Sequence, residues 1–307
     1  MENIKAQNPL MCDPETGICE VAARDTEPTD IKMEAKQKPV RLLYFTDPIC
    51  SSCWGIEPQL RKLKLEYGEY FDIEYRMGGL LKSWDSYGGR DVSGPRSVSQ
   101  HWDEASDAYQ MPIDGSVWLE DPLDSSYPPS IAFKAAQIQS DEKALVFLRG
   151  IKEMVFLAKK NIAKWEHLED AATQAGLDIK QFKIDFEGKA KELFEEDMAL
   201  ARSLGVRGFP TIFFMDEEGN RFLVYGARKY EQYVEALLKL YPNAEKKVYD
   251  KNPESLFGEF STLTLKEFAE LTEKNLLEAE TVLDNLHAQK LIDKFTTRNG
   301  AVWRKIA

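Results

Sequence analysis

Two pairs of cysteines are the residues in this sequence whose type and spacing could carry out chemistry. Cys50 and Cys53 are separated by two serines, directly after a short apolar run and directly before a helical pattern. A thiol at the start of a helix meets unpaired backbone N–H groups and the positive end of the helix dipole, and both favour the thiolate. We therefore expect Cys50 to be a low-pKa catalytic nucleophile and Cys53 to resolve the mixed disulfide.

The same cysteines have two other interpretations, as half of a metal site or as two inert helix residues. A structural zinc ion usually takes four ligands. The three histidines, His101, His167 and His287, are scattered along the chain without the spacing of metal ligands. We therefore predict redox chemistry at this pair and no metal site.

The second pair, Cys12 and Cys19, encloses the segment Asp-Pro-Glu-Thr-Gly, which favours a turn. Such a turn can bring the two thiols together. They are either an auxiliary redox pair that exchanges with Cys50 and Cys53, or two exposed thiols on a tail. Both interpretations stay open at this point.

The elements around Cys50 follow the order strand, helix, strand, long helical segment, hairpin, helix. The assignment rests on apolar runs or alternation for strands and on helical spacing of apolar residues for helices. It predicts strands at 41–46, 71–75, 211–215 and 221–225, and helices at 56–67, 98–109, 165–175, 182–204 and 230–241.

A proline stands at the start of the expected strand 211–215. Proline there donates no ladder hydrogen bond, and a bond from any residue to proline is the usual place of a cis peptide. We expect the bond between Phe209 and Pro210 to be cis and to face Cys50. An ordinary trans proline in a turn is the alternative.

Taken in order, these motifs resemble the DsbA family of thioredoxin-like proteins, in its FrnE-like branch of disulfide oxidoreductases and isomerases. The resemblance covers about residues 40–242 and rests on the segments TDPICSSCWG (46–55), MGGL (77–80) and GVRGFP (205–210). It implies a nucleophile at Cys50 and a resolving thiol at Cys53. It also implies that Phe209, Pro210 and Trp54 bind the substrate.

Two further segments, residues 121–136 and 156–162, resemble the SpxH (YjbH) family of protease adaptors. These are DsbA-like proteins that present the regulator Spx to the ClpXP protease, and they too carry extra sequence after the thioredoxin unit. This resemblance implies a non-enzymatic function in which the same groove holds another protein.

Composition divides the chain into three parts. Residues 1–39 lack a hydrophobic period and are expected to be a tail with a cysteine pair, followed by a DsbA-like thioredoxin domain at 40–242 with a helical insertion at about 85–204. After a polar linker, residues 254–307 predict two helices and a hairpin, the plan of a winged helix. The fold class is therefore α/β, a thioredoxin fold with a large helical insertion and a small C-terminal winged-helix-like unit.

Charge and hydropathy argue against two classes of partner. The 307 residues carry 52 acidic and 40 basic side chains, a formal net charge of −12, which does not suit a phosphate backbone. No apolar run is long enough to span a membrane, and the first residues lack the plan of a signal peptide, so a cytoplasmic protein is expected. We expect residues 254–307 to dock on the thioredoxin domain or on a protein partner, or to form a homodimer.

These observations predict a thiol–disulfide oxidoreductase or isomerase that acts on the thiols or disulfides of protein substrates. It would need no cofactor, and a redox partner would recycle it. The alternative is the non-enzymatic adaptor that presents a partner protein to a protease.

Overall fold

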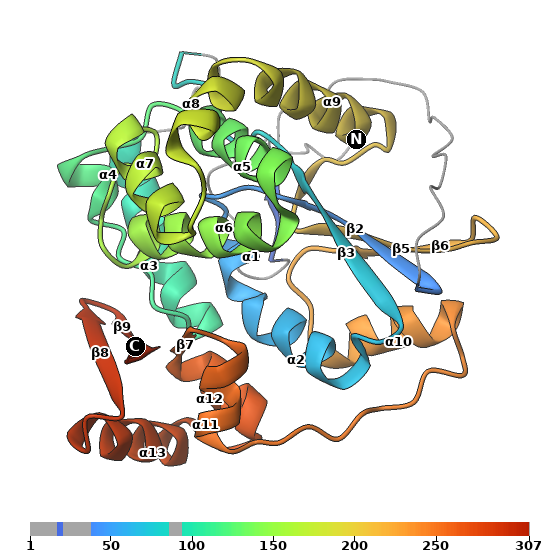
Figure 1. The fold of residues 1–307 in the computed structure, drawn as a ribbon, viewed down its shortest axis with the longest axis vertical. Helices are drawn as coiled ribbons and strands as arrows, with labels where there is room; N and C mark the ends of the chain where they lie inside the picture. The colour runs from blue at the N-terminus through green and yellow to red at the C-terminus, as the bar shows by residue number, and fades with distance from the viewer. Residues whose placement is uncertain (1–16, 21–37, 86–93, 307) are drawn as a thin grey trace, which may run out of the picture.

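The structure is a computed structural model that describes residues 17–20, 38–85 and 94–306. Its larger part has three layers, with a four-stranded sheet between two groups of helices (Figure 1). The strands lie in the order β3-β2-β5-β6 and are β2 (Val40–Thr46), β3 (Phe71–Met77), β5 (Thr211–Asp216) and β6 (Arg221–Tyr225). All four predicted strands are confirmed to within two residues.

β2 is a central strand of this sheet, and its side chains alternate between the two helical layers. Leu43 and Phe45 belong to one buried cluster, together with residues of the helical insertion. Val40, Leu42 and Tyr44 belong to a second cluster on the other face. An apolar run such as that of residues 42–45 is what a strand buried on both faces requires.

The register of β2 brings two loops to the same end of the sheet. β2 runs parallel to β3 and antiparallel to β5, and in the second pair Phe45 lies opposite Thr211. The end of β2, which leads to Cys50, therefore lies beside the start of β5, which follows Pro210. Strand pairing thus brings together two motifs that are far apart in the sequence.

One helical layer consists of α2 (Glu57–Tyr67) and α10 (Tyr230–Leu240). The other is the helical insertion, which contains α3 (Pro95–Tyr109), α4 (Val117–Glu120), α5 (Tyr127–Gln139), α6 (Asp141–Phe156), α7 (Trp165–Gln174), α8 (Ile179–Glu187) and α9 (Lys189–Ser203). The single helix expected at 182–204 is wrong. Gly188 has φ −117° and ψ −110°, outside the helical region, and separates α8 from α9.

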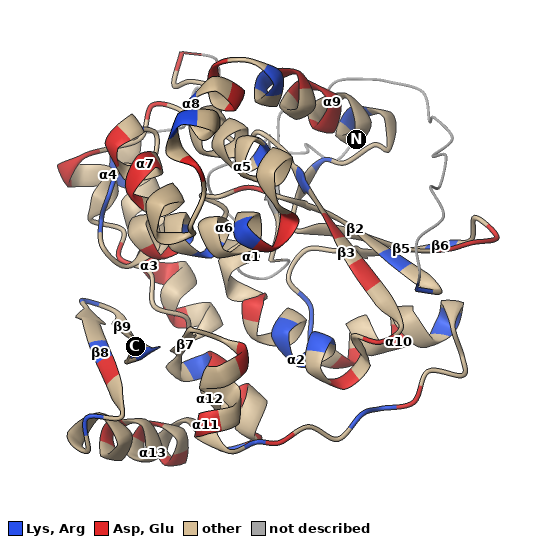
Figure 2. Ribbon diagram, in the orientation of Figure 1, with Lys and Arg blue, Asp and Glu red and all other residues tan. Residues whose placement is uncertain are grey.

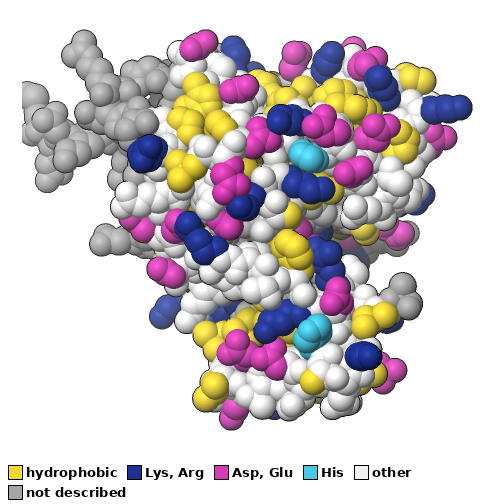
Figure 3. Space-filling model, turned by 90° about the vertical axis from the view of Figure 1, so that its left-hand side faces the viewer, with side chains coloured by type: hydrophobic (Ala, Val, Ile, Leu, Met, Phe, Trp, Pro, Cys, Tyr) yellow, Lys and Arg dark blue, Asp and Glu magenta, His cyan; other side chains and the backbone are white. Residues whose placement is uncertain are grey.

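The C-terminal unit begins after a segment without helix or strand and has its own core. It consists of α11 (Pro253–Glu259), β7 (Thr262–Thr264), α12 (Leu265–Thr272), α13 (Leu276–Ala288), β8 (Ile292–Thr297) and β9 (Gly300–Lys305), with the sheet order β7-β9-β8. It forms a narrower lobe below the larger part (Figure 3). The predicted helices and hairpin are present. The elements α11 and β7 were not predicted, because they are too short to show a periodic pattern of apolar residues. The winged-helix-like assignment itself stays a prediction.

Acidic and basic residues are mixed along the helices of the larger part and along the segment between α10 and α11 (Figure 2). In space, that segment lies against the end of α2, where the backbone N–H of Lys247 donates to the carbonyl oxygen of Glu66 at 2.8 Å. The side chain of Lys246 also pairs with the carboxylate of Glu66 at 2.9 Å. Among the described residues, no helix is long and apolar enough to cross a membrane.

Candidate functional site

The two cysteines of the first pair lie where β2 leads into α1 (Ser51–Gly55). Cys50 is the N-cap of this helix, and its sulfur accepts a hydrogen bond from the backbone N–H of Cys53 at 3.1 Å. The two residues do not form a disulfide. Both are 0% exposed, so neither sulfur can meet a disulfide of another protein unless the surrounding residues move.

The pKa values of the two thiols are shifted in opposite directions, and that of Cys50 is raised where the sequence predicted a lowered value. Burial raises the pKa of Cys50 well above its usual range, and the neighbouring thiol of Cys53 adds to this effect. Burial also acts to raise the pKa of Cys53, but hydrogen bonding with Cys50 and the ammonium group of Lys152 lower it below its usual value. The expectation of a low-pKa Cys50 is therefore wrong, because it considered the helix dipole and not the loss of solvent.

A buried carboxylate, Asp47, holds the loop between β2 and Cys50. It accepts hydrogen bonds from the backbone N–H of Leu80 at 2.7 Å and of Ile49 at 3.1 Å, and from the hydroxyl of Ser126 at 2.8 Å. Burial raises the pKa of Asp47 to about 6, although these donors act in the other direction. The role of Asp47 was not predicted, because its only signal in the sequence is its place three residues before Cys50.

The raised pKa of Asp47 predicts a stability that depends on pH. The folded protein holds the proton of Asp47 more tightly than the unfolded chain, so the free energy of unfolding should fall as the pH rises from about 4 to about 6. The fall attributable to this group should be about 2 kcal/mol over this range, out of about 3 kcal/mol for the complete titration. Urea denaturation of the unmodified protein and of Asp47→Asn across this range measures it, and the variant should lack this component.

The matched control for this measurement is Asp72→Asn on β3, where the carboxylate is partly exposed and pairs with Lys38 at 3.2 Å. It should leave the pH dependence between 4 and 6 unchanged. If Asp47→Asn and the unmodified protein lose the same free energy over this range, Asp47 does not titrate as argued.

The bond between Phe209 and Pro210 is cis, as the sequence predicted. Phe209 is 1% exposed and belongs to the same buried cluster as Cys50 and Cys53. Its ring fills the space beside Gly78, where an added Cβ would approach it to 1.8 Å. The predicted binding role of Phe209 can therefore involve its backbone but not its buried side chain.

The backbone of Phe209 already has a partner strand. Gly208 and Phe209 form β4, which pairs antiparallel with β1 (Cys19–Glu20), and Cys19 lies opposite Phe209. Cys12 lies outside the described residues, so the interpretation of Cys12 and Cys19 as an auxiliary redox pair stays a prediction.

Trp54 is 0% exposed and has no surface to offer to a substrate, which corrects its predicted binding role. Its indole N–H donates to the carbonyl oxygen of Pro112 at 3.1 Å. Its ring stacks on Phe156, with 5.5 Å between the ring centroids, and the guanidinium of Arg149 lies 4.4 Å from the ring centre. Trp54 therefore positions α1 against the insertion.

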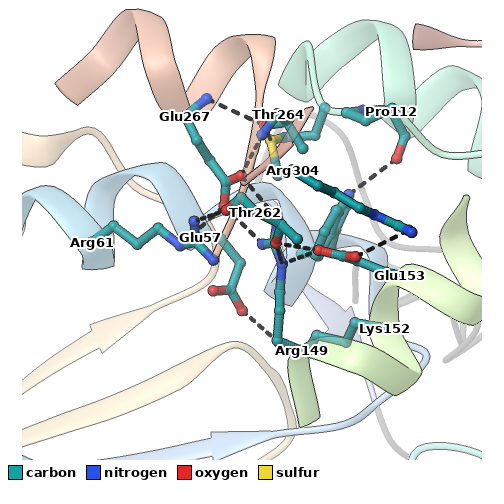
Figure 4. Close-up of polar contacts among 12 residues, drawn as sticks. Glu57, Arg61, Pro112, Arg149, Lys152, Glu153, Thr262, Thr264, Glu267 and Arg304 are labelled. Carbon is teal, nitrogen blue, oxygen red and sulfur yellow. Dashed lines mark hydrogen bonds and ion pairs between the residues drawn. The ribbon is translucent and has the colours of Figure 1, made fainter. Parts of the chain in front are cut away.

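Arg149 joins this packing to a largely buried charge network of Arg61, Arg149, Glu153, Glu267 and the more exposed Arg304, beside which Lys152 pairs with Glu57 (Figure 4). Its guanidinium donates twice to the carboxylate of Glu267, at 2.8 and 3.0 Å. Arg61 approaches the same carboxylate at 3.2 Å, and Arg149 also bonds to Glu153 at 2.7 Å. One carboxylate of α12 thus meets guanidinium groups from α2 and from α6.

A separate ion pair lies beside this network, and one further branch extends from Glu153. Lys152 pairs with Glu57 at 2.7 Å and is 1% exposed. Glu153 accepts a short hydrogen bond from the hydroxyl of Thr262 and lies 3.6 Å from the guanidinium of Arg304. Sequence analysis missed the network because its members are far apart in the chain and form no local pattern.

The C-terminal unit also contacts α3 through the turn between β8 and β9. The side-chain amide of Asn299 donates to Asp103 at 2.8 Å and to the carbonyl oxygen of Ile113 at 2.7 Å. Docking of this unit on the rest of the chain, one of the arrangements expected from the sequence, is therefore confirmed. Among the described residues, no group of three or more His, Cys, Asp or Glu side chains could hold a metal ion.

Comparison with known proteins connects both parts of the chain to a family. Residues 43–235 match the sequence profile of a family described as Thioredoxin. ClpXP adapter protein SpxH of Halalkalibacterium halodurans is 33% identical, over 97% of this chain and 98% of that protein, and SpxH of Bacillus subtilis is 29% identical over 88% and 91%. The cytosolic disulfide reductase DsbM of Pseudomonas aeruginosa has a TM-score of 0.53 at 22% identity, over 65% of this chain and 99% of that one.

These comparisons confirm the thioredoxin fold and overturn the predicted enzyme. The relatives that match over nearly the whole chain are ClpXP adapters, whereas the disulfide reductase shares the fold at low identity. The prediction of a redox-active disulfide oxidoreductase or isomerase is therefore wrong. The thiol or disulfide substrates and the redox recycling partner follow from that chemistry alone and are withdrawn with it, while the homodimer stays a prediction.

Proposed function

Because the chain belongs to the thioredoxin family, among the SpxH-type ClpXP adapter proteins, we propose that it is a non-enzymatic adaptor that presents a partner protein to ClpXP. The observation that carries the proposal is the length of the similarity, which covers both the thioredoxin part and the C-terminal unit. The proposal includes a cytoplasmic location and a protein client, for which the regulator Spx is the candidate that the family resemblance implies.

Two features of the described residues support this proposal. Cys50 and Cys53 are both fully buried, and burial raises the pKa of Cys50, so the thiol that an exchange enzyme would use for attack is neither accessible nor activated. The C-terminal unit is held on α2 and α6 by the buried charge network. An adaptor that contacts a client and a protease at once needs two surfaces in a fixed relation, and such a network provides it.

The proposal predicts that the chain accelerates degradation of Spx by purified ClpXP without needing its thiols. Degradation is followed as loss of Spx over time, with the unmodified chain and with the double variant Cys50→Ser, Cys53→Ser. The rate with the variant should lie within about twofold of the rate with the unmodified chain, since an adaptor holds its client by surface contacts and both thiols are buried.

A glutathione-coupled assay on a protein disulfide is run in parallel and should show no turnover by either protein. No acceleration of Spx loss by the unmodified chain would contradict the adaptor. Acceleration that disappears in the double variant would show that the adaptor function depends on the thiols.

A further inference from the structure

The described part of the N-terminal segment forms a strand on the loop that precedes β5. In the two-stranded sheet of β1 and β4, Cys19 lies opposite Phe209 and Glu20 lies opposite Gly208. β4 leads through Pro210 directly into β5, at the end of the sheet where β2 leads to Cys50. The chain therefore pairs its own backbone with β4, in a small sheet separate from the four-stranded one.

The two residues before β1 are fitted closely to their surroundings. The carbonyl oxygen of Gly17 accepts a hydrogen bond from the backbone N–H of Ala227 at 2.8 Å. Gly17 has a φ of +66°, and a Cβ added to it would lie 2.5 Å from the Cβ of Ala227 and 2.7 Å from its nitrogen. Ile18 is only 8% exposed. We call the site formed by β4 and Ala227 the seat. Its contacts require a glycine followed by an aliphatic residue.

An edge that pairs with an extended segment is a known mode of peptide recognition, in which main-chain hydrogen bonds give affinity and pockets for side chains give specificity. The seat at β4 has both components, the paired backbone and the burial of Ile18. We propose that Gly17–Glu20 is an internal competitor, which occupies this seat until an extended segment of a partner protein displaces it.

The competition has a defined energetic form. A segment tied to the same chain has an effective local concentration in the millimolar range or above, so it outcompetes a free segment of equal intrinsic affinity at micromolar concentration. A partner segment with a small residue and an aliphatic residue at the positions of Gly17 and Ile18 must therefore bind more tightly, or gain from contacts elsewhere. Weakening the internal strand should raise the apparent affinity for such a segment without any new contact.

The test uses two variants of the full chain and one probe. Gly17→Val places a branched side chain at a positive φ against Ala227, and Ile18→Asp places a carboxylate in an apolar seat. The probe is a fluorescent peptide that copies residues 15–22 with Cys19→Ser, and binding is measured by anisotropy. Both variants should bind the probe at least tenfold more tightly than the unmodified chain.

Two controls make the result specific. Gly219→Val also introduces a branched side chain at a positive φ, +85°, but nothing lies within 4 Å of the added Cβ, so it should bind the probe as weakly as the unmodified chain does. A probe that carries Ile18→Asp should bind none of the proteins. Circular dichroism checks that all variants are folded.

Equal binding of the probe to the unmodified chain and to both variants would overturn the proposal, and so would no binding to any of them. The assay contains neither ClpXP nor Spx. A failure of the internal competitor would therefore not contradict the adaptor function, and a failure of the adaptor function would not contradict the competitor.

Discussion

Glu267→Gln should lower the free energy of unfolding by about 3–5 kcal/mol, the usual cost of removing one partner from a buried ion pair. Glu267 is 0% exposed and receives two hydrogen bonds from Arg149 and an ion pair from Arg61. Burial acts to raise the pKa of Glu267, but the two guanidinium groups outweigh it and hold the pKa below its usual value. A neutral amide would remove the carboxylate that pairs with Arg61 and leave Arg149 with that of Glu153 alone. Urea denaturation measures the effect.

The matched control is Glu270→Gln on the same helix, whose carboxylate pairs with Lys266 at 2.7 Å near the surface. Such a pair contributes about 0.5 kcal/mol or less, so this variant should behave like the unmodified protein. Limited proteolysis of the segment between α10 and α11 gives a second measurement, since a loosened C-terminal unit should expose it only in Glu267→Gln. Equal stability of the two variants would show that the network does not hold the units together.

Trp54→Ala should cost about 3–5 kcal/mol of stability, the range for removing a large buried aromatic side chain. The change empties a site between Phe156 and Arg149 and leaves the carbonyl oxygen of Pro112 without the indole donor. Trp54→Phe keeps much of the packing and loses the hydrogen bond together with part of the ring, so it should cost less than Trp54→Ala, about 1–2 kcal/mol.

Trp84→Ala is the control for Trp54→Ala, because Trp84 is also an aromatic residue against the insertion but is only partly buried. It should cost less than Trp54→Ala in the same urea titration. If Trp54→Ala is no more destabilising than Trp84→Ala, Trp54 is not the residue that positions α1. A partner-binding role for its ring would then have to be reconsidered.

Local periodicity explains what the sequence predicted well. The apolar run of β2 and the spacing of apolar residues in α10 depend only on neighbours in the chain, and both elements lie where they were expected. The cis bond before Pro210 was also predicted, because the order of strands around it limits where such a loop can lie.

Contacts between distant segments explain what the sequence did not predict. Arg149 and Glu267 are 118 residues apart, and nothing around either residue indicates the other. Burial of Cys50 and Trp54 likewise depends on elements that a linear pattern does not bring together. The wrong function has a related cause, since one thioredoxin fold serves both exchange enzymes and adaptors and the Cys50–Cys53 motif does not separate them.

Helix α2 lies between the central sheet and the C-terminal unit. Its Leu60 and Leu63 face the sheet, Arg61 reaches Glu267 of α12, and Glu66 holds the segment that leads to α11. Of the 11 residues of α2, only Lys64 is exposed. A helix on the outside of a lone thioredoxin domain can vary freely along one whole face, whereas here one face of α2 must fit the sheet and another must fit the C-terminal unit. Substitutions in α2 are therefore constrained by the second unit as well as by the first.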